Sequence, residues 1–126
     1  MISRIKTSEA PKAIGTYSQG SRVKDLVFTS GQIGVDPKTG DLVSQNFKDE
    51  VLQVLKNVSA VLDAGGSSID RLIKLTVFIK DMSNFQLVNE VFSSFFKSDY
   101  PARSLVEVSD LPGAANIEIE AIGEVL

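Results

Sequence analysis

The fold is decided by the stretch Leu72-Ile73-Lys74-Leu75-Thr76-Val77-Phe78-Ile79-Lys80, in which apolar residues recur at every second position. Successive side chains of a β-strand point to opposite faces of its sheet. One face is therefore expected to be strongly apolar and to carry Ile73, Leu75, Val77 and Ile79. The other face is expected to carry Lys74, Thr76, Phe78 and Lys80. The stretch predicts a strand that buries one face against a core.

A helix is predicted before this strand. Its apolar residues recur at helical spacing and form one stripe, made of Phe47, Val51, Val54, Leu55, Val58, Val61 and Leu62. Asn46 is suited to the N-cap position, and the acidic residues Asp49 and Glu50 in the first turn suit the helix dipole. The pair Gly65-Gly66 is expected to end the helix.

A second helix is predicted after the strand. Ser83 and Gln86 have the spacing of a capping box, which would open this helix. Its apolar stripe comprises Phe85, Val88, Phe92, Phe95 and Phe96. Asn89 lies four residues after Phe85 and three before Phe92, so it falls on or beside that stripe.

The remaining segments predict further strands and a turn. Strands are expected over Leu26 to Ile33, Ser104 to Val108 and Ile117 to Val125, and the Pro and Gly within residues 36–41 indicate a turn. The order of strands, helix, strand, helix and strands predicts an α+β fold with two helices on one face of a mixed sheet. A chain of 126 residues fits one domain, residues 1–126.

The sheet face that the helices leave open has an unusual composition. In the last strand it would carry Glu118, Glu120, Ile122 and Glu124. In the central strand it would carry Phe78 between Thr and Lys. This face is either solvated or covered by another subunit, and the apolar residues Phe78 and Ile122 favour a subunit.

Composition excludes several kinds of chemistry. The chain has no His and no Cys, so thiolate and Ser-His nucleophiles are impossible. A net charge of −3, with scattered Lys and Arg, argues against nucleic acid as a partner. No phosphate-binding loop and no dinucleotide fingerprint is present. Carboxylate-only Mg²⁺ or Ca²⁺ sites stay open, although no recognisable loop supports a metal site. The N-terminal residues lack a long apolar stretch, and we expect a soluble protein of the cytoplasm with no membrane segment.

Arg103 and Glu118 are the strongest candidates for chemistry. Arg103 follows Pro101 at the start of a strand, where its planar fork can bind a carboxylate in bidentate fashion. The alternative for Arg103 is a surface ion pair. Glu118 can serve as a base that orients water if its face becomes buried, because burial shifts the pKa of a carboxyl. The alternative for Glu118 is a solvated outer face.

Other residues can form the walls of a pocket. Tyr17 lies between Gly15 and Gly20 and can supply a ring wall and a hydroxyl, or can simply cap the core. Gly31 would let a ligand approach the backbone, with Ser30 donating a hydrogen bond; the alternative is a β-bulge. Asn89 can bond a ligand or a neighbouring backbone group.

Together these segments resemble the Rid family, the reactive intermediate deaminases, also called the YjgF family. The likeness extends along nearly the whole chain, in the expected order, and is closest to the deaminating RidA-like subgroup. The matching segments are Ala10-Pro11-x-Ala13-Ile14-Gly15-x-Tyr17-Ser18-Gln19-Gly20, Thr29-Ser30-Gly31-Gln32-Ile33, Thr76-Val77-Phe78-Ile79-Lys80-Asp81, Val88-Asn89, Pro101-Ala102-Arg103-Ser104, Val106-Glu107-Val108 and Ile117-Glu118-Ile119-Glu120-Ala121.

The resemblance implies both an architecture and a reaction. The architecture is a chorismate-mutase-like α+β fold of the Bacillus type, assembled as a homotrimer whose sheets form a central β-barrel, with active sites in clefts between subunits. The reaction is hydrolysis of short 2-imino acids and their enamine tautomers, such as 2-iminobutanoate and 2-aminoacrylate. The products are 2-keto acids and ammonia, and no cofactor takes part.

The resemblance also implies roles for residues at matching positions. Arg103 matches the carboxylate-binding Arg, and Glu118 matches the water-activating Glu. Other pocket positions are matched by Tyr17, Ser30, Gly31 and Asn89. Leu105 stands where the family often has Cys, so a backbone contact there would survive the change and a thiol role would not. Thr16 replaces a frequent Pro, which is expected to loosen the Tyr17 loop.

Two alternative functions stay open from the sequence. A non-catalytic sensor of 2-keto acids would use the same Arg103 pocket, with Glu118 merely hydrogen-bonded. RNA binding or cleavage, also attributed to this family, is disfavoured by the acidic balance and by the lack of a basic stripe.

Overall fold

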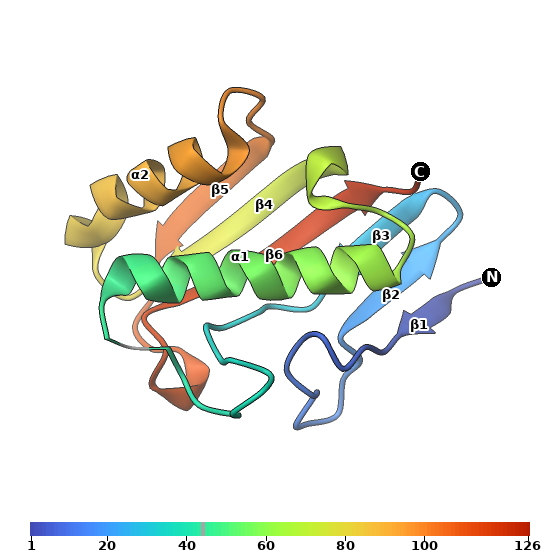
Figure 1. Ribbon diagram of the computed structural model, residues 1–126, viewed down its shortest axis with the longest axis horizontal. Helices are drawn as coiled ribbons and strands as arrows, with labels where there is room; N and C mark the ends of the chain where they lie inside the picture. Colours follow the sequence, from blue (N-terminus) through green and yellow to red (C-terminus); the bar gives the residue numbers. More distant parts are fainter. Residues whose placement is uncertain (44) are drawn as a thin grey trace.

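Six strands form one mixed sheet in the computed structural model, which describes residues 1–43 and 45–126. The strands are β1 (Ser3–Ile5), β2 (Gly20–Val23), β3 (Leu26–Thr29), β4 (Leu72–Ile79), β5 (Ala102–Glu107) and β6 (Ile117–Glu124). They lie in the order β1-β2-β3-β6-β4-β5 (Figure 1). The pair β4–β5 is parallel and the other pairs are antiparallel.

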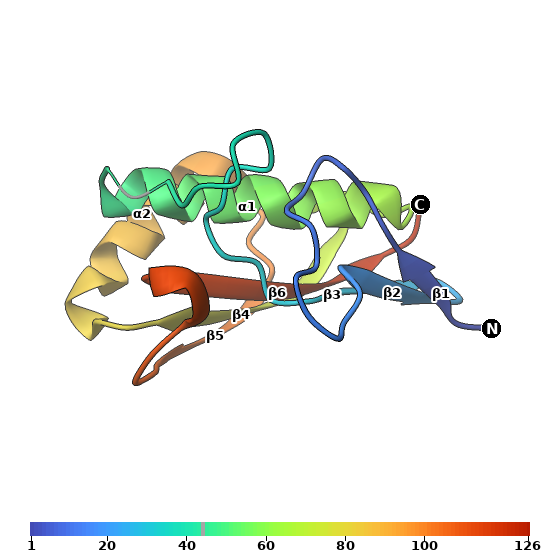
Figure 2. The same ribbon diagram turned by 90° about the horizontal axis from the view of Figure 1, so that it is seen from below.

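Two α-helices cover one face of this sheet and leave the other face open (Figure 2). They are α1 (Phe47–Ala64) and α2 (Phe85–Phe96), and short 3-10 turns occupy Ile69–Arg71, Met82–Asn84 and Pro112–Ala114. The core between the helices and the sheet includes Val54, Leu55, Val58, Leu75, Val77, Ile117 and Ile119, all fully buried. The predicted α+β fold with two helices on one face is thus confirmed.

Helix α1 begins and ends as its sequence predicts. The side chain of Asn46 accepts a hydrogen bond of 2.9 Å from the backbone N–H of Asp49. Gly65 is the C-cap, and Gly66 follows with φ of +91°, a left-handed conformation that glycine adopts without strain. The predicted apolar stripe is buried from Val51 to Leu62.

The predicted capping box at the start of α2 is wrong. The carboxylate of Asp81, not the Ser83 side chain, provides the cap, accepting a 3.0 Å hydrogen bond from the backbone N–H of Ser83. A 3-10 turn over Met82–Asn84 therefore precedes the helix, and Asn84 makes no side-chain cap bond. In a capping box the Gln86 side chain would accept from the Ser83 N–H; the Asp81 carboxylate, a charged acceptor two residues before Ser83, binds that donor instead.

The predicted alternation of β4 fails at its first residues. The register with β6 shifts between Leu72 and Lys74, which marks a β-bulge. Ile73 is consequently 44% exposed, whereas Leu75, two residues on, is fully buried. The predicted strand over residues 26–33 is also shorter, because β3 ends at Thr29 and only Gln32 returns to pair with Ile119.

The open face carries several apolar side chains among its charges. The registers place Phe28 opposite Ile122 and Phe78 opposite Glu118 on this face. Phe28 is 39% exposed, and Phe78 and Ile122 are half-buried. Within the described part of the chain, no helix has the length and apolar character needed to cross a bilayer.

The bulge in β4 makes a direct prediction about stability. Leu75→Ala should lower the free energy of unfolding by about 2–5 kcal/mol, because it leaves a cavity in the core. Ile73→Ala should change it by less than about 0.5 kcal/mol, because Ile73 lies outside the core. Chemical denaturation of both variants checks this, and equal losses would contradict the observed register.

Candidate functional site

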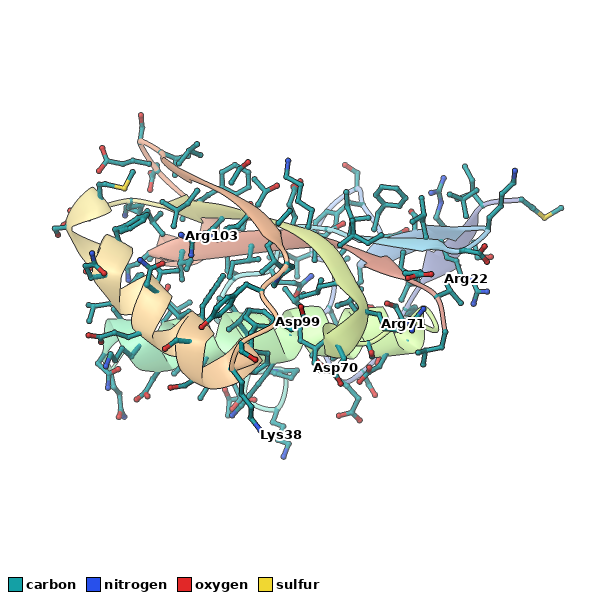
Figure 3. The ribbon with its side chains drawn as sticks, turned by 90° about the horizontal axis from the view of Figure 1, so that it is seen from above. Arg22, Lys38, Asp70, Arg71, Asp99 and Arg103 are labelled. Atoms are coloured by element: carbon teal, nitrogen blue, oxygen red, sulfur yellow. The ribbon has the colours of Figure 1, made fainter. Side chains whose placement is uncertain are left out.

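Arg103 lies on the helix-covered face of the sheet, at the end near α2 and away from Arg22 and Arg71 (Figure 3). Its position opposite Leu75 in the β4–β5 register brings its side chain beneath α2. The guanidinium Nη1 donates a 3.0 Å hydrogen bond to Oδ1 of Asn89. The guanidinium carbon lies 5.6 Å from the ring centre of Phe85 and 5.4 Å from that of Phe92. These contacts hold the cation in one orientation.

Arg103 has no acidic partner in the part of the chain that the structure describes. Among residues 1–43 and 45–126, no Asp or Glu lies within ion-pair distance of Arg103, although the side chain is half-buried. Arg103 and Asn89 line a cavity of about 360 Å³ together with Leu75, Phe92, Ser93, Tyr100 and Pro101. A half-buried cation beside a cavity is favourable for an anion that enters from outside.

Glu118 lies on the other, open face. It is half-buried opposite Phe78 in the β4–β6 register. Burial, and to a smaller extent the nearby carboxylate of Glu120, raises the pKa of the Glu118 carboxyl above its ordinary value. A carboxylate with a raised pKa is a better proton acceptor in its ionised form, which suits a general base.

Gly31 packs directly against this carboxyl. A Cβ atom at position 31 would lie 2.6 Å from Oε2 of Glu118, so a side chain there would displace the Glu118 carboxyl. Glycine at position 31 therefore lets this carboxyl lie directly against the backbone of the segment. Tyr17 and Gly31 both line a second cavity, of about 470 Å³.

Ser30 and Gln19 hold the Tyr17 loop. The hydroxyl of Ser30 donates a 2.5 Å hydrogen bond to the carbonyl of Ser18, so its proton is already engaged within the chain. The Gln19 side chain is buried and bonds to the main chain of Thr7, Ala10 and Pro11. Gln19 was not among the predicted site residues, although it stands in the matching segment that leads from Tyr17 into β2.

The candidate residues thus form two groups. Arg103, Asn89 and the half-buried Leu105 lie on the helix side of the sheet, with β5 as its edge strand. Glu118 and Gly31 lie in contact with each other, Glu118 on the open face. Arg103 and Glu118 do not meet within one chain, so a site that uses both draws them from two copies. Among the described residues, no group of three or more acidic side chains lies close enough together to hold a metal ion.

Comparison with known proteins identifies the class of this chain. A family model described as Endoribonuclease L-PSP matches residues 7–125. The chain belongs to this family, the YjgF or Rid family.

Relatives cover the chain almost completely. A RutC family protein of Pyrococcus horikoshii is 49% identical over 94% of both chains. The human 2-iminobutanoate/2-iminopropanoate deaminase is 44% identical over 94% of this chain and 86% of its own.

Solved structures agree closely with this fold. TdcF of E. coli, crystallised with bound serine, has a TM-score of 0.93 and 43% identity, covering 98% of this chain and 99% of its own. RidA of an Antarctic Psychrobacter species has a TM-score of 0.93 and 41% identity over the same shares. The mixed sheet with two helices therefore matches the structures of the Rid family.

The pair Glu118–Glu120 allows a test of the local electrostatics. Glu120→Gln should lower the pKa of Glu118, because it removes a neighbouring negative charge. The pKa should still stay above the ordinary value, because burial is the larger cause and remains. A 13C NMR titration of the Glu118 carboxyl measures it.

Glu124→Gln is the matched control, since Glu124 lies further along the same face of β6. It should leave the Glu118 titration unchanged. An unchanged midpoint in Glu120→Gln would show that the two carboxylates do not interact.

Proposed function

We propose that this protein is an enamine and imine deaminase that hydrolyses short 2-imino acids, such as 2-iminobutanoate and 2-iminopropanoate, to 2-keto acids and ammonia. The observation that carries the proposal is Arg103, a half-buried cation with no acidic partner among the described residues and with a cavity beside it. Relatives named 2-iminobutanoate/2-iminopropanoate deaminase, at 42–44% identity, support it.

We further propose that the active unit is a homotrimer with its sites between subunits. The open sheet face supports this, because Phe28, Phe78 and Ile122 lie on it with no helix to cover them. The placement of Arg103 and Glu118 on opposite faces supports it too, since neighbouring copies can bring them together. Packing three open faces around one axis would form the central barrel.

In the proposed site, Arg103 holds the substrate carboxylate through its planar fork. Asn89 orients the guanidinium, and backbone groups of the edge strand near Leu105 hold the nitrogen side of the imine together with Gly31. Tyr17 forms a wall, and Ser30 keeps the Tyr17 loop in place through Ser18.

Glu118 activates the water. Its carboxylate takes a proton as the water oxygen bonds to C2 of the protonated imine, and the electron pair of the C2–N double bond becomes the lone pair of an amino group. Glu118 then gives this proton to the amino group. As the C2–N bond breaks and its electron pair leaves with ammonia, Glu118 takes the hydroxyl proton, C2 and oxygen form the double bond of the 2-keto acid, and the proton passes from Glu118 to water. The raised pKa of Glu118 suits both steps.

This reaction does not need a His or Cys side chain, both of which the sequence lacks. The imine carbon is already electrophilic, so the uncatalysed barrier is low. One positioned general base gives roughly 10²–10⁴-fold acceleration. Fixing the carboxylate and the water adds an orientational contribution.

Arg103→Lys tests the carboxylate clamp. A lysine keeps the charge but loses the fork, and the loss of one charge-assisted hydrogen bond is worth about 1.5–3 kcal/mol, or about 10- to 100-fold in kcat/KM. The assay follows ammonia release from freshly formed 2-iminobutanoate. Arg22→Lys is the control, because among the described residues the Arg22 side chain donates to the Lys24 and Gly65 carbonyls, far along the sheet.

Near-normal turnover by Arg103→Lys would contradict the clamp. The same assay on the wild-type protein also distinguishes a deaminase from a non-catalytic sensor of 2-keto acids. Binding of a 2-keto acid without faster ammonia release would assign a binding function instead.

Glu118→Gln tests the base and, with Arg103→Lys, the shared site. Alone, Glu118→Gln should still bind a 2-keto acid but lose about 10²–10⁴-fold in kcat. When the two inactive variants are mixed within trimers, each mixed trimer regains one site with both native side chains. Trimers that contain both variants should therefore show about a third of wild-type activity.

The measurement uses co-expressed variants with two different tags and purification through both. No recovery of activity in doubly tagged trimers would show that Arg103 and Glu118 do not act across a subunit boundary.

A further inference from the structure

Two polar side chains interrupt the buried face of α1. Glu50 and Asn57 are each only 1% exposed, and their neighbours on this face are Val51, Val54, Leu55 and Val58. Burying a carboxylate or an amide is unfavourable unless its polar atoms are hydrogen-bonded. The partners of Glu50 and Asn57 therefore show what these residues do.

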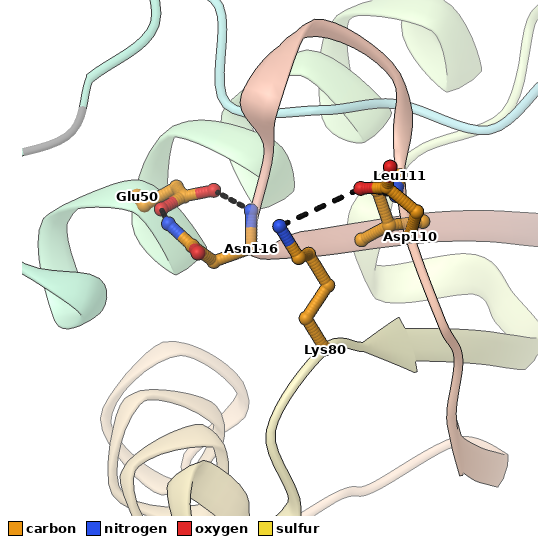
Figure 4. A network of polar contacts seen from close by, with 5 residues as sticks. All are labelled: Glu50, Lys80, Asp110, Leu111 and Asn116. Carbon is orange, nitrogen blue, oxygen red and sulfur yellow. Dashed lines mark hydrogen bonds and ion pairs between the residues drawn. The ribbon is translucent and has the colours of Figure 1, made fainter.

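Glu50 holds the start of β6 (Figure 4). Its Oε2 accepts a 2.7 Å hydrogen bond from the backbone N–H of Asn116, and its Oε1 accepts a 2.9 Å bond from Asn116 Nδ2. Asn116 immediately precedes β6, and Glu118 follows two residues later. The nearby ion pair between Lys80 and Asp110, at 3.5 Å, does not involve Glu50 (Figure 4).

Asn57 holds the segment that follows Gly31. Its Nδ2 donates hydrogen bonds of 2.9 Å to the Ile33 carbonyl and 2.8 Å to the Val35 carbonyl. Its Oδ1 accepts a 2.9 Å bond from Gln53, so every polar atom of Asn57 has a partner. Gly34, between the two held carbonyls, packs against Glu50, and a Cβ there would lie 2.8 Å from Glu50 Cγ.

The two held segments meet at the candidate base. Gln32 and Ile119 exchange backbone hydrogen bonds of 2.8 and 3.0 Å. One residue earlier on each segment, Gly31 lies against the Glu118 carboxyl. Helix α1 thus holds, from the helix-covered side of the sheet, the segment after Gly31 and the start of β6. The separation of these two segments determines where the Glu118 carboxyl lies.

We propose that Glu50 and Asn57 are positioning residues that set the place of the Glu118 carboxyl against the Gly31 backbone. The expected effect of these residues on turnover rests on the proposed function. Their effect on the position of the Glu118 carboxyl does not. The other titratable groups on this face are Glu120 in β6, Lys74 in β4 and Lys80 directly after β4. None of them bonds to Glu50 or Asn57.

Glu50→Gln and Glu50→Ala separate positioning from stability. Glu50→Gln can keep both bonds if the Asn116 amide turns over, because the new Oε1 accepts from the backbone N–H and the new Nε2 donates to Asn116 Oδ1. Glu50→Ala removes both bonds. Leu62→Ala is the control, since Leu62 is fully buried on the same helix but packs near Gly123, at the far end of β6.

Two readouts are used on the full chain, a 13C NMR titration of Glu118 and steady-state turnover of 2-iminobutanoate. Glu50→Ala should displace the Glu118 titration and lower kcat at least about tenfold with little change in KM, because a shift of about 1 Å can cost about 10²-fold. Glu50→Gln should retain kcat within about twofold. Leu62→Ala should lower the melting temperature and leave the titration and kcat unchanged.

A wild-type titration and kcat in Glu50→Ala would overturn the inference, whatever happens to its stability. If Glu50→Ala does not fold, Asn116→Ala removes one of the two bonds at an exposed residue, and an unchanged Glu118 titration there would overturn the inference as well. A wild-type protein without turnover would refute the proposed function alone. In that case a displaced titration in Glu50→Ala, restored in Glu50→Gln, would still support the positioning role.

Discussion

The alternation of side chains across the sheet constrains everything that the candidate site can do. Leu75 pairs with Arg103 and Phe78 pairs with Glu118, and these two residues of β4 face opposite ways. The cation therefore lies beneath α2 and the carboxylate lies on the open face. No choice of rotamer brings them together through a sheet. A reaction that uses both side chains therefore requires at least two copies of the chain, so catalysis of this kind would depend on oligomerisation.

Within a single chain, neither the Arg103 guanidinium nor the Glu118 carboxylate has a partner of opposite charge among the described residues. Arg103 is half-buried and held by Asn89 and two aromatic rings, with no acidic partner in the described residues. Burial raises the pKa of Glu118, so its ionised form is disfavoured. In the proposed reaction, a small 2-imino acid would present its carboxylate to Arg103 and its electrophilic carbon to a water activated by Glu118. One substrate would then use both groups.

The local periodicity of the sequence predicted the helices, the strands and the α+β architecture. It could not predict features that depend on the register between strands far apart in the sequence. The helical stripe with Asn46 as N-cap and the alternation from Leu75 onward specify the core. The bulge that exposes Ile73 depends on β6, almost fifty positions away, and no local pattern contains it. Glu50 was expected to serve the helix dipole, yet it is buried because its partner Asn116 lies 66 residues along the chain. For the candidate site, the residue types and the open face of Glu118 were predictable, but the place of Arg103 on the opposite face required the strand register.

The most direct test of this account is a crystal structure of the assembled protein with a short 2-keto acid bound. We expect the ligand carboxylate within hydrogen-bond distance of the Arg103 guanidinium of one subunit. Its C2 atom should face the Glu118 carboxyl contributed by a neighbouring subunit, beside Gly31. A ligand bound away from Arg103, or a Glu118 that points into bulk solvent in the assembly, would contradict the account.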